Sequence, residues 1–170
     1  GFVGAPIDLD ATVVLIDDIG NISDAVYYNQ LVTSVTESDT QELAEWQEDG
    51  FDEVIDIKLS YLDQNINYLA ILVSSYKGVG FYNIETATVT LFQDEAKVAE
   101  IFLGAVKSNK NNTVLAAIIY KKEGQWHIYN SQSQSPGKVF TECQQIIKWN
   151  LSRVGFDPDI LQKSKTWTSK

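Results

Sequence analysis

Short runs rich in β-branched and aromatic residues recur along the chain, and turn signals separate them. They span residues 11–17, 25–32, 53–59, 68–76, 86–93, 97–104, 113–122 and 124–132. Runs of this length and composition predict β-strands. The run YLAILVSSY at 68–76 is almost entirely apolar, which is typical of a central strand covered on both faces. Glu123-Gly124 between the last two runs predicts a tight hairpin.

Two further stretches, residues 38–48 and 138–153, are predicted to be helical. The second places five apolar side chains near one face: Val139, Cys143, Ile146, Ile147 and Leu151. Ser135-Pro136 predicts where this helix begins, and Gly155 predicts where it ends.

About eight strands, with one or two peripheral helices and no strand–helix alternation, predict an all-β (mainly) fold, an antiparallel β-sandwich. The chain has 170 residues, of which 44% are hydrophobic, so it can bury a sizeable core and differs from a disordered chain. We therefore expect one sandwich over residues 1–137. The C-terminal helix and polar tail of residues 138–170 pack on it or extend from it.

The charge is unevenly distributed. Residues 1–63 carry 15 acids and one base, whereas residues 64–170 carry 8 acids and 12 bases. The net charge of −10 makes nucleic acid a poor partner and cations good ones. No apolar run approaches the roughly 20 residues that span a bilayer. The single cysteine forms no internal disulfide, which suits a reducing compartment such as the cytoplasm.

The acids of the first half fall beside the predicted strands. Asp8 and Asp10 precede the first strand, Asp24 and Asn29 bracket the second, and EDGFDE at 48–53 precedes the third. Loops at one end of a sandwich lie close together, so such acids repel unless a cation joins them. Calcium takes six to eight oxygen ligands at flexible angles, and this pattern has no His or Cys for zinc or copper. The alternative is a solvated acidic face that only keeps the protein soluble.

The order of the motifs resembles the TerD domain of tellurite-resistance and stress proteins. The matching segments are IDLDATVVLID, ISDAVYYNQL, EDGFDEVIDIKL, NYLAILVSSY, FYNIETATVTLF, AEIFL and VLAAIIYKKEGQWHIYNSQ. The resemblance covers roughly residues 4–137, and the opening D-L-D-A-T is its most specific part. Phe51, Gln30 and Lys77 depart from residues common in the family, and Lys77 lies in a short 76–81 loop.

This resemblance implies a calcium-binding, non-catalytic β-sandwich that acts as a cytoplasmic stress-response or interaction module. It implies Ca²⁺ as the bound ion. It also implies partners among other stress-response proteins, including membrane-associated ones. The family's motif residues map onto Asp8, Asp10, Asp24, Asn29, Asp49, Asp52 and Glu53.

Two other functions stay open from the sequence. A sandwich that binds a small molecule such as a cyclic nucleotide needs a cluster of basic side chains for phosphate, and Arg153 is the only arginine. A hydrolase that uses a metal-bound water needs an open coordination position and a general base, and the sequence shows neither. A serine-nucleophile triad would need His127, the only histidine, as its base, but no G-x-S-x-G elbow is present. We interpret His127 as a half-exposed strand residue and Cys143 as a small buried hydrophobe.

Overall fold

A computed structural model describes residues 9–27, 55, 57, 59, 62–75, 88–93, 96–103, 112–137 and 140–156 of the chain. The strands within these ranges are β1 (Leu9–Asp17), β2 (Ile22–Tyr27), β3 (Ile66–Ser75), β4 (Thr88–Gln93), β5 (Ala96–Phe102), β6 (Thr113–Lys122) and β7 (Gln125–Ser135). A 3-10 turn, η4 (Phe140–Cys143), leads into the helix α2 (Gln144–Arg153). The prediction of a mainly β, antiparallel fold is confirmed.

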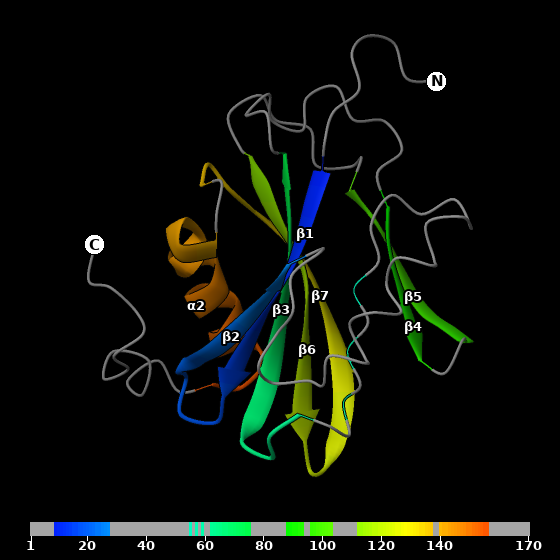
Figure 1. Cartoon of the computed structure of the whole chain (residues 1–170), viewed down its shortest axis with the longest axis vertical. Helices are drawn as coiled ribbons and strands as arrows, with labels where there is room; N and C mark the ends of the chain where they lie inside the picture. The colour runs from blue at the N-terminus through cyan, green and yellow to red at the C-terminus, as the bar shows by residue number, and fades with distance from the viewer. Residues whose placement is uncertain are drawn as a thin grey trace, which may run out of the picture.

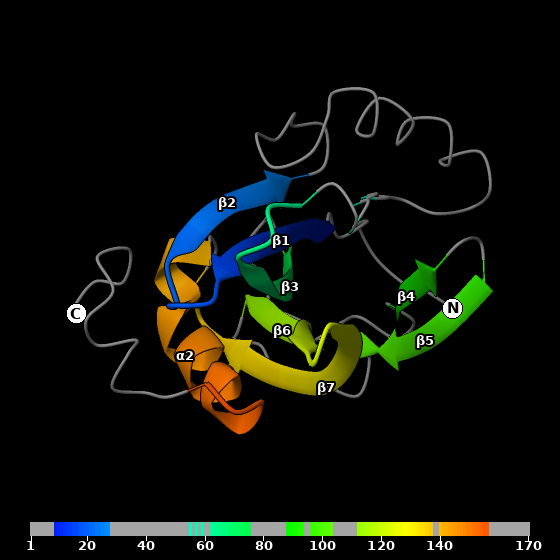
Figure 2. The same cartoon turned by 90° about the horizontal axis from the view of Figure 1, so that it is seen from below.

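Five strands form one antiparallel sheet in the order β2-β1-β3-β6-β7, and β4 pairs with β5 in a second, two-stranded sheet (Figure 1). β3 occupies the centre of the large sheet, in agreement with its almost continuous apolar sequence. Seen from below, the large sheet lies between α2 on one face and the β4–β5 pair on the other (Figure 2).

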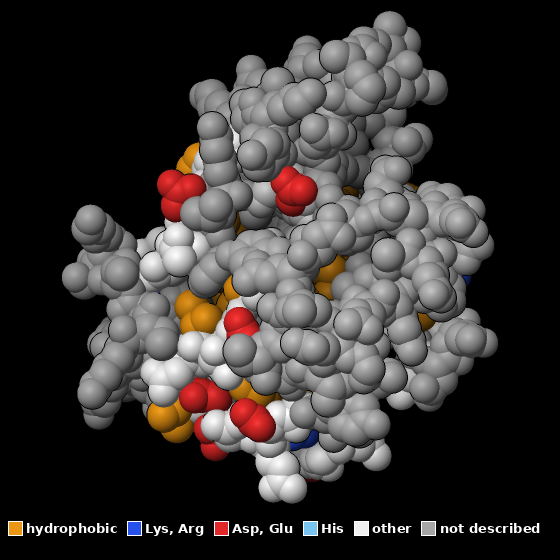
Figure 3. All heavy atoms as spheres, in the orientation of Figure 1, with side chains coloured by type: hydrophobic (Ala, Val, Ile, Leu, Met, Phe, Trp, Pro, Cys, Tyr) orange, Lys and Arg blue, Asp and Glu red, His pale blue; other side chains and the backbone are white. Residues whose placement is uncertain are grey.

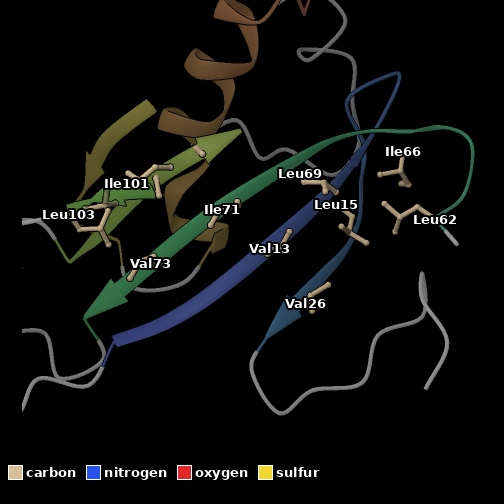
Figure 4. Packing of buried hydrophobic residues seen from close by; sticks show 13 residues of the cluster. Val13, Leu15, Val26, Leu62, Ile66, Leu69, Ile71, Val73, Ile101 and Leu103 are labelled. Atoms are coloured by element: carbon tan, nitrogen blue, oxygen red, sulfur yellow. The ribbon is translucent and has the colours of Figure 1, made fainter. Parts of the chain in front are cut away.

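The first core cluster fills the face of the large sheet opposite α2. Alternate residues of the strands point into it, including Val13, Leu15 and Ile71, and Ile101 and Leu103 cover them from the β5 side (Figure 4). Ile55, Ile57 and Leu59 pack against the same cluster, as their alternating pattern predicts. These three residues are not in a β-strand, because Ile55 and Ile57 have no regular secondary structure and Leu59 lies in a 3-10 turn, so the predicted strand is wrong at these positions. The other residues of 53–59 lie outside the described residues.

The second core cluster lies between the sheet and α2. Val14 and Leu72 belong to the alternate set of strand positions, and they meet Ile147 and Leu151 of the helix. Cys143, Ile147 and Leu151 are buried, so the predicted apolar face of the helix is confirmed for these three residues. Among the described residues, no helix is long and apolar enough to cross a membrane.

The predicted start of the C-terminal helix is wrong. Ser135 ends β7 instead of beginning a helix, and α2 begins only at Gln144. The reason is a set of long-range bonds: Ser135 pairs with Thr113 of β6, and the Thr113 hydroxyl donates to the carbonyl oxygen of Gly137 at 2.5 Å. These contacts hold the chain extended past Pro136. The predicted end of the helix is confirmed, since α2 stops at Arg153 and Gly155 adopts φ of 95°.

β7 contains a bulge that α2 holds in place. Leu115 of β6 faces Ser133, but Ala117 faces Asn130, so two residues of β7 face one residue of β6. Gln132 within the bulge has φ of 52°. Asn150 of α2 is fully buried beside it and bonds to both serines that flank Gln132.

Apart from residues 53–59, the remaining strand predictions agree with the described part of the structure to within a few residues. The hairpin at Glu123-Gly124 is confirmed, with φ of 54° and 76° at the two turn residues, as a tight two-residue turn requires. The predicted strand 25–32 is observed as 22–27 in its described part. The predicted helix at 38–48 lies outside the described residues, and the division at residue 137 stays a prediction.

Candidate functional site

The end of the large sheet at which β1 begins carries one of the predicted ligands. Asp10 is the second residue of β1 and lies directly opposite Ser74 of β3. Thr12, two residues further along β1, faces Tyr27, the last residue of β2. β1 therefore begins where β2 and β3 end, as the antiparallel order requires.

Asp10 starts a row of polar side chains that crosses four strands. In the register of the sheet, Asp10 lies opposite Ser74, Ser74 opposite Thr113, and Thr113 opposite Ser135. Directly opposite residues share a face of the sheet, and this row lies on the face covered by α2. Ser74, Thr113 and Ser135 are buried, whereas Asp10 is half-buried. The row thus leads from the interior to a carboxylate at the rim.

The hydroxyls of the row have a defined direction of hydrogen bonding. The Ser74 and Thr113 hydroxyl oxygens lie 2.8 Å apart. Because Thr113 gives its single proton to the Gly137 carbonyl oxygen, Ser74 must donate to Thr113. The Ser74 oxygen, next to Asp10, therefore keeps lone pairs that can accept a hydrogen bond or contact a cation.

The inner end of the row is closed. The Ser135 hydroxyl accepts a hydrogen bond from the Gly137 backbone N–H at 3.1 Å, and Cys143 lies over the row with 1% of its surface exposed. Burial raises the pKa of the Cys143 thiol, and hydrogen bonds with Ser135 and Thr113 only partly oppose this. A buried neutral thiol is a poor nucleophile and a poor metal ligand.

Asp10 itself has no partner that the described residues supply. Among these residues, none donates a hydrogen bond or forms an ion pair with its carboxylate. A half-buried carboxylate without a donor raises the free energy of the fold, and a cation or ordered water offsets that cost. The oxygen atoms of Asp10 and Ser74 suit a hard cation such as calcium.

Asp24 does not join Asp10. Asp24 faces Leu15 of β1, so it lies on the face of the first core cluster, whereas Asp10 lies on the α2 face. Leu15 is five residues beyond Asp10, which places the two carboxylates about 17 Å apart along the strand. Ligands of one calcium ion lie within about 5 Å of each other. One Asp24 carboxylate oxygen accepts a hydrogen bond from the Ala25 backbone N–H at 2.8 Å.

The other predicted ligands lie outside the described residues. They are Asp8, Asn29, Asp49, Asp52 and Glu53. Metal binding by the set therefore stays a prediction. Over the residues that the structure does describe, no group of three or more His, Cys, Asp or Glu side chains is gathered as a metal site.

A second acidic region lies at the opposite end of the sheet, and sequence reasoning did not single it out as a site. Figure 3 shows acidic side chains gathered over the turn between β1 and β2. The Asp17 carboxylate accepts hydrogen bonds from the backbone N–H groups of Ile19 and Asn21, at 3.1 and 2.7 Å. The Asp18 N–H donates to the Asn65 carbonyl oxygen at 2.8 Å. These contacts form the turn and attach it to the loop before β3. This structural role agrees with the turn-forming residues Asp, Gly and Asn in the sequence of the turn, DDIGN.

His127 and Tyr120 form a stacked pair beside this second region. Their rings lie 5.3 Å apart at 26°, and His127 is exposed on β7, a more open position than the half-exposed one expected. Tyr68 is the next residue in the same row across the strands, and Phe156 packs edge-on against it at 5.2 Å. Burial, and then the charge of Asp18, raises the pKa of Tyr68. These contacts are those of a packed aromatic row.

Comparisons of the chain with a family model and with a curated protein agree on one protein family. The TerD domain matches residues 3–137. The chain is 30% identical over 123 residues to tellurium resistance protein TerZ of Serratia marcescens, a match that covers 71% of this chain and 62% of that protein. The chain thus spans less than two thirds of this relative's length. A crystal structure of the protein SAV2460, of unknown function, superposes with a TM-score of 0.63 at 14% identity, over 82% of this chain and 88% of that one, and supports the fold.

Proposed function

Because the chain belongs to the TerD domain family, we propose that it is a calcium-binding, non-catalytic interaction module of the stress response. In this proposal it works in the cytoplasm. Its partners are other stress-response proteins, including membrane-associated ones. The name of its relative refers to tellurium resistance. Any such role here would depend on the cation site, because the only thiol is buried.

The observation that carries the proposal is the state of Asp10. Its carboxylate is half-buried at the rim of the polar row, and no described residue donates to it. The neighbouring Ser74 hydroxyl gives its proton inward to Thr113, so it presents oxygen lone pairs and not a proton. This donor set attracts a hard cation and repels an anion.

The proposed ligand set is narrower than the sequence alone predicts. It comprises Asp10 and its sequence neighbour Asp8, with Asn29 and the acids Asp49, Asp52 and Glu53 as further oxygen donors. Asp24 is left out because it lies on the opposite face of the sheet. If Asp24 binds a cation, that cation occupies a separate site.

Calcium would act electrostatically in this proposal. Residues 1–63 carry a charge of −14, from 15 acids and one base, and bound Ca²⁺ lowers the repulsion among those acids nearest to it. The bound form would then present an ordered acidic end to a partner. Binding to the folded state alone stabilises the protein by about 2.7 kcal/mol when free calcium exceeds Kd a hundredfold.

The test is a calorimetric titration of the chelated protein with Ca²⁺ and separately with Mg²⁺, on wild type and two variants. Asp10→Asn removes the proposed ligand, and Asp24→Asn is a matched control on the same pair of strands. We expect wild type and Asp24→Asn to bind Ca²⁺ more tightly than Mg²⁺, and Asp10→Asn to bind Ca²⁺ at least tenfold more weakly, which corresponds to about 1.4 kcal/mol.

Thermal unfolding provides the second measurement. In chelator, Asp10→Asn should be as stable as wild type or more so, because it removes a half-buried charge to which no described residue donates a hydrogen bond. In calcium it should lose the stabilisation that wild type gains. The proposal fails if wild type takes up no calcium, or if both variants bind calcium equally weakly, because the effect would then be one of bulk charge.

A further inference from the structure

The strand β7 is an uncharged edge of the large sheet. It is the last strand in the order β2-β1-β3-β6-β7, and within the described part of the chain it pairs with β6 alone. Figure 2 shows it at the rim of the molecule, beside α2. Its eleven residues, QWHIYNSQSQS, include no Asp, Glu, Lys or Arg. Gln125, His127, Ile128 and Asn130 in its first half are all exposed.

Sheet edges normally carry a feature that prevents pairing with another chain, such as a charge, a proline or a bulge. The other edge strand, β2, carries Asp24. β7 has its bulge at residues 131–132, which interrupts the edge only in its second half. The stretch Gln125–Asn130 is therefore regular, uncharged and rich in residues that favour strands.

We propose that two copies of this chain associate by antiparallel pairing of β7 with β7, around a two-fold axis at Ile128. In a symmetric antiparallel pair the axis must pass through a residue that faces its own counterpart, because hydrogen-bonding positions alternate along each strand. An axis at Ile128 pairs the exposed aliphatic side chain of β7 with itself. It also places His127 opposite Tyr129 and keeps the bulge at the end of the paired region.

The side chains on both faces of this edge suit such a contact. On the face of the first core cluster, Ile128 is 39% exposed and lies two residues from Trp126. On the α2 face, the Arg153 side chain stacks on the exposed Trp149 at 4.7 Å and donates from Nε to the Tyr129 hydroxyl at 2.7 Å. These two contacts fix the positions of the Tyr129 and Trp149 rings, which lie along the β7 edge.

Charge favours this edge over the other for a second copy. The chain carries a net charge of −10, so two copies repel over most of their surface. Pairing of β2 with β2 would bring Asp24 close to its own counterpart, and like charges across strands are destabilising. Pairing through Gln125–Asn130 brings no such charges together, because this stretch contains no Asp, Glu, Lys or Arg.

Sedimentation velocity of the whole chain over a wide range of concentrations tests this proposal. We expect wild type to shift from monomer to dimer as concentration rises. Ile128→Lys places two like charges opposite each other and should raise the dimer Kd about tenfold or more. Val98→Lys is the matched control: Val98 is 48% exposed on β5, outside the large sheet, and this substitution should leave the Kd unchanged.

Hydrogen exchange of wild type gives a readout that needs no variant. Amides of residues 125–130 should exchange more slowly as the protein concentration rises, and those of β2 should not. A wild type that stays monomeric at every concentration overturns the proposal. So does a dimer that weakens equally in both lysine variants, or one in which residues 125–130 gain no protection.

Discussion

Replacing Asn150 by alanine tests whether α2 fastens the bulge of β7. The Asn150 side chain is fully buried and makes three hydrogen bonds. Its Nδ2 donates to the Ser133 hydroxyl oxygen at 2.9 Å and to the Ile146 carbonyl oxygen at 2.7 Å, and its Oδ1 accepts from the Ser131 hydroxyl at 2.9 Å. The bond between Ser131 and Ser133, at 3.0 Å, does not involve Asn150 and can survive the substitution.

The expected loss follows from these contacts. Each hydrogen bond contributes about 1 kcal/mol net to stability, so three contribute about 3 kcal/mol. Alanine is the better helix former by about 0.5 kcal/mol, which offsets part of that loss. We therefore expect Asn150→Ala to lower the free energy of unfolding by about 2–3 kcal/mol, which for a chain of this length corresponds to roughly 5–10 °C in Tm.

Urea unfolding followed by tryptophan fluorescence measures this quantity. Asn130→Ala is the control, because Asn130 lies beside the bulge on β7 but is exposed, and its loss should stay within about 0.5 kcal/mol. Hydrogen exchange should become faster at residues 131–133 in Asn150→Ala. A loss below about 1 kcal/mol would show that water replaces the amide and that Asn150 does not hold the bulge.

Gly137→Ala should cost about 1–3 kcal/mol, because a Cβ there would stand 2.6 Å from the Glu142 Cβ and 2.9 Å from its carbonyl oxygen. Gly124→Ala, which meets no atom within 4 Å but has φ of +76°, should cost only about 1 kcal/mol, and equal losses in urea unfolding would contradict this order. Stability should fall as pH rises above about 8.5, the ordinary thiol pKa, because burial raises the pKa of Cys143 and the unfolded chain releases its proton first. Cys143→Ala should flatten this part of the pH–stability curve, and a curve parallel to that of wild type would disprove the assignment.

Much of the local structure follows from the sequence. Alternation of apolar residues identifies Ile55, Ile57 and Leu59 as one face, and all three pack on the first core cluster. Glu123-Gly124 marks its hairpin because both positions need a positive φ, which a local residue pair can supply. The helix after β7 is correct in its buried face and its end, since both depend on residues a few positions apart.

The start of that helix could not be predicted in the same way. Ser135-Pro136 is a common helix-start signal, but here Ser135 pairs with Thr113, 22 residues earlier in the sequence. The Gly137 carbonyl oxygen accepts from the same threonine. Such bonds form only when β6 and β7 are already side by side, so no local pattern around residue 135 contains them.

The candidate site, too, could be predicted from the sequence only in part. The sequence alone placed Asp10 at the entry of the first strand and showed that residues 1–63 are rich in carboxylates and contain no His or Cys. Only the tertiary structure decided that Asp24 lies inside β2 on the opposite face, and that Ser74, Thr113 and Ser135 form a row behind Asp10. The face on which a strand residue lies depends on the register between strands distant in sequence, and burial of the two cores on either side of the sheet selects that register.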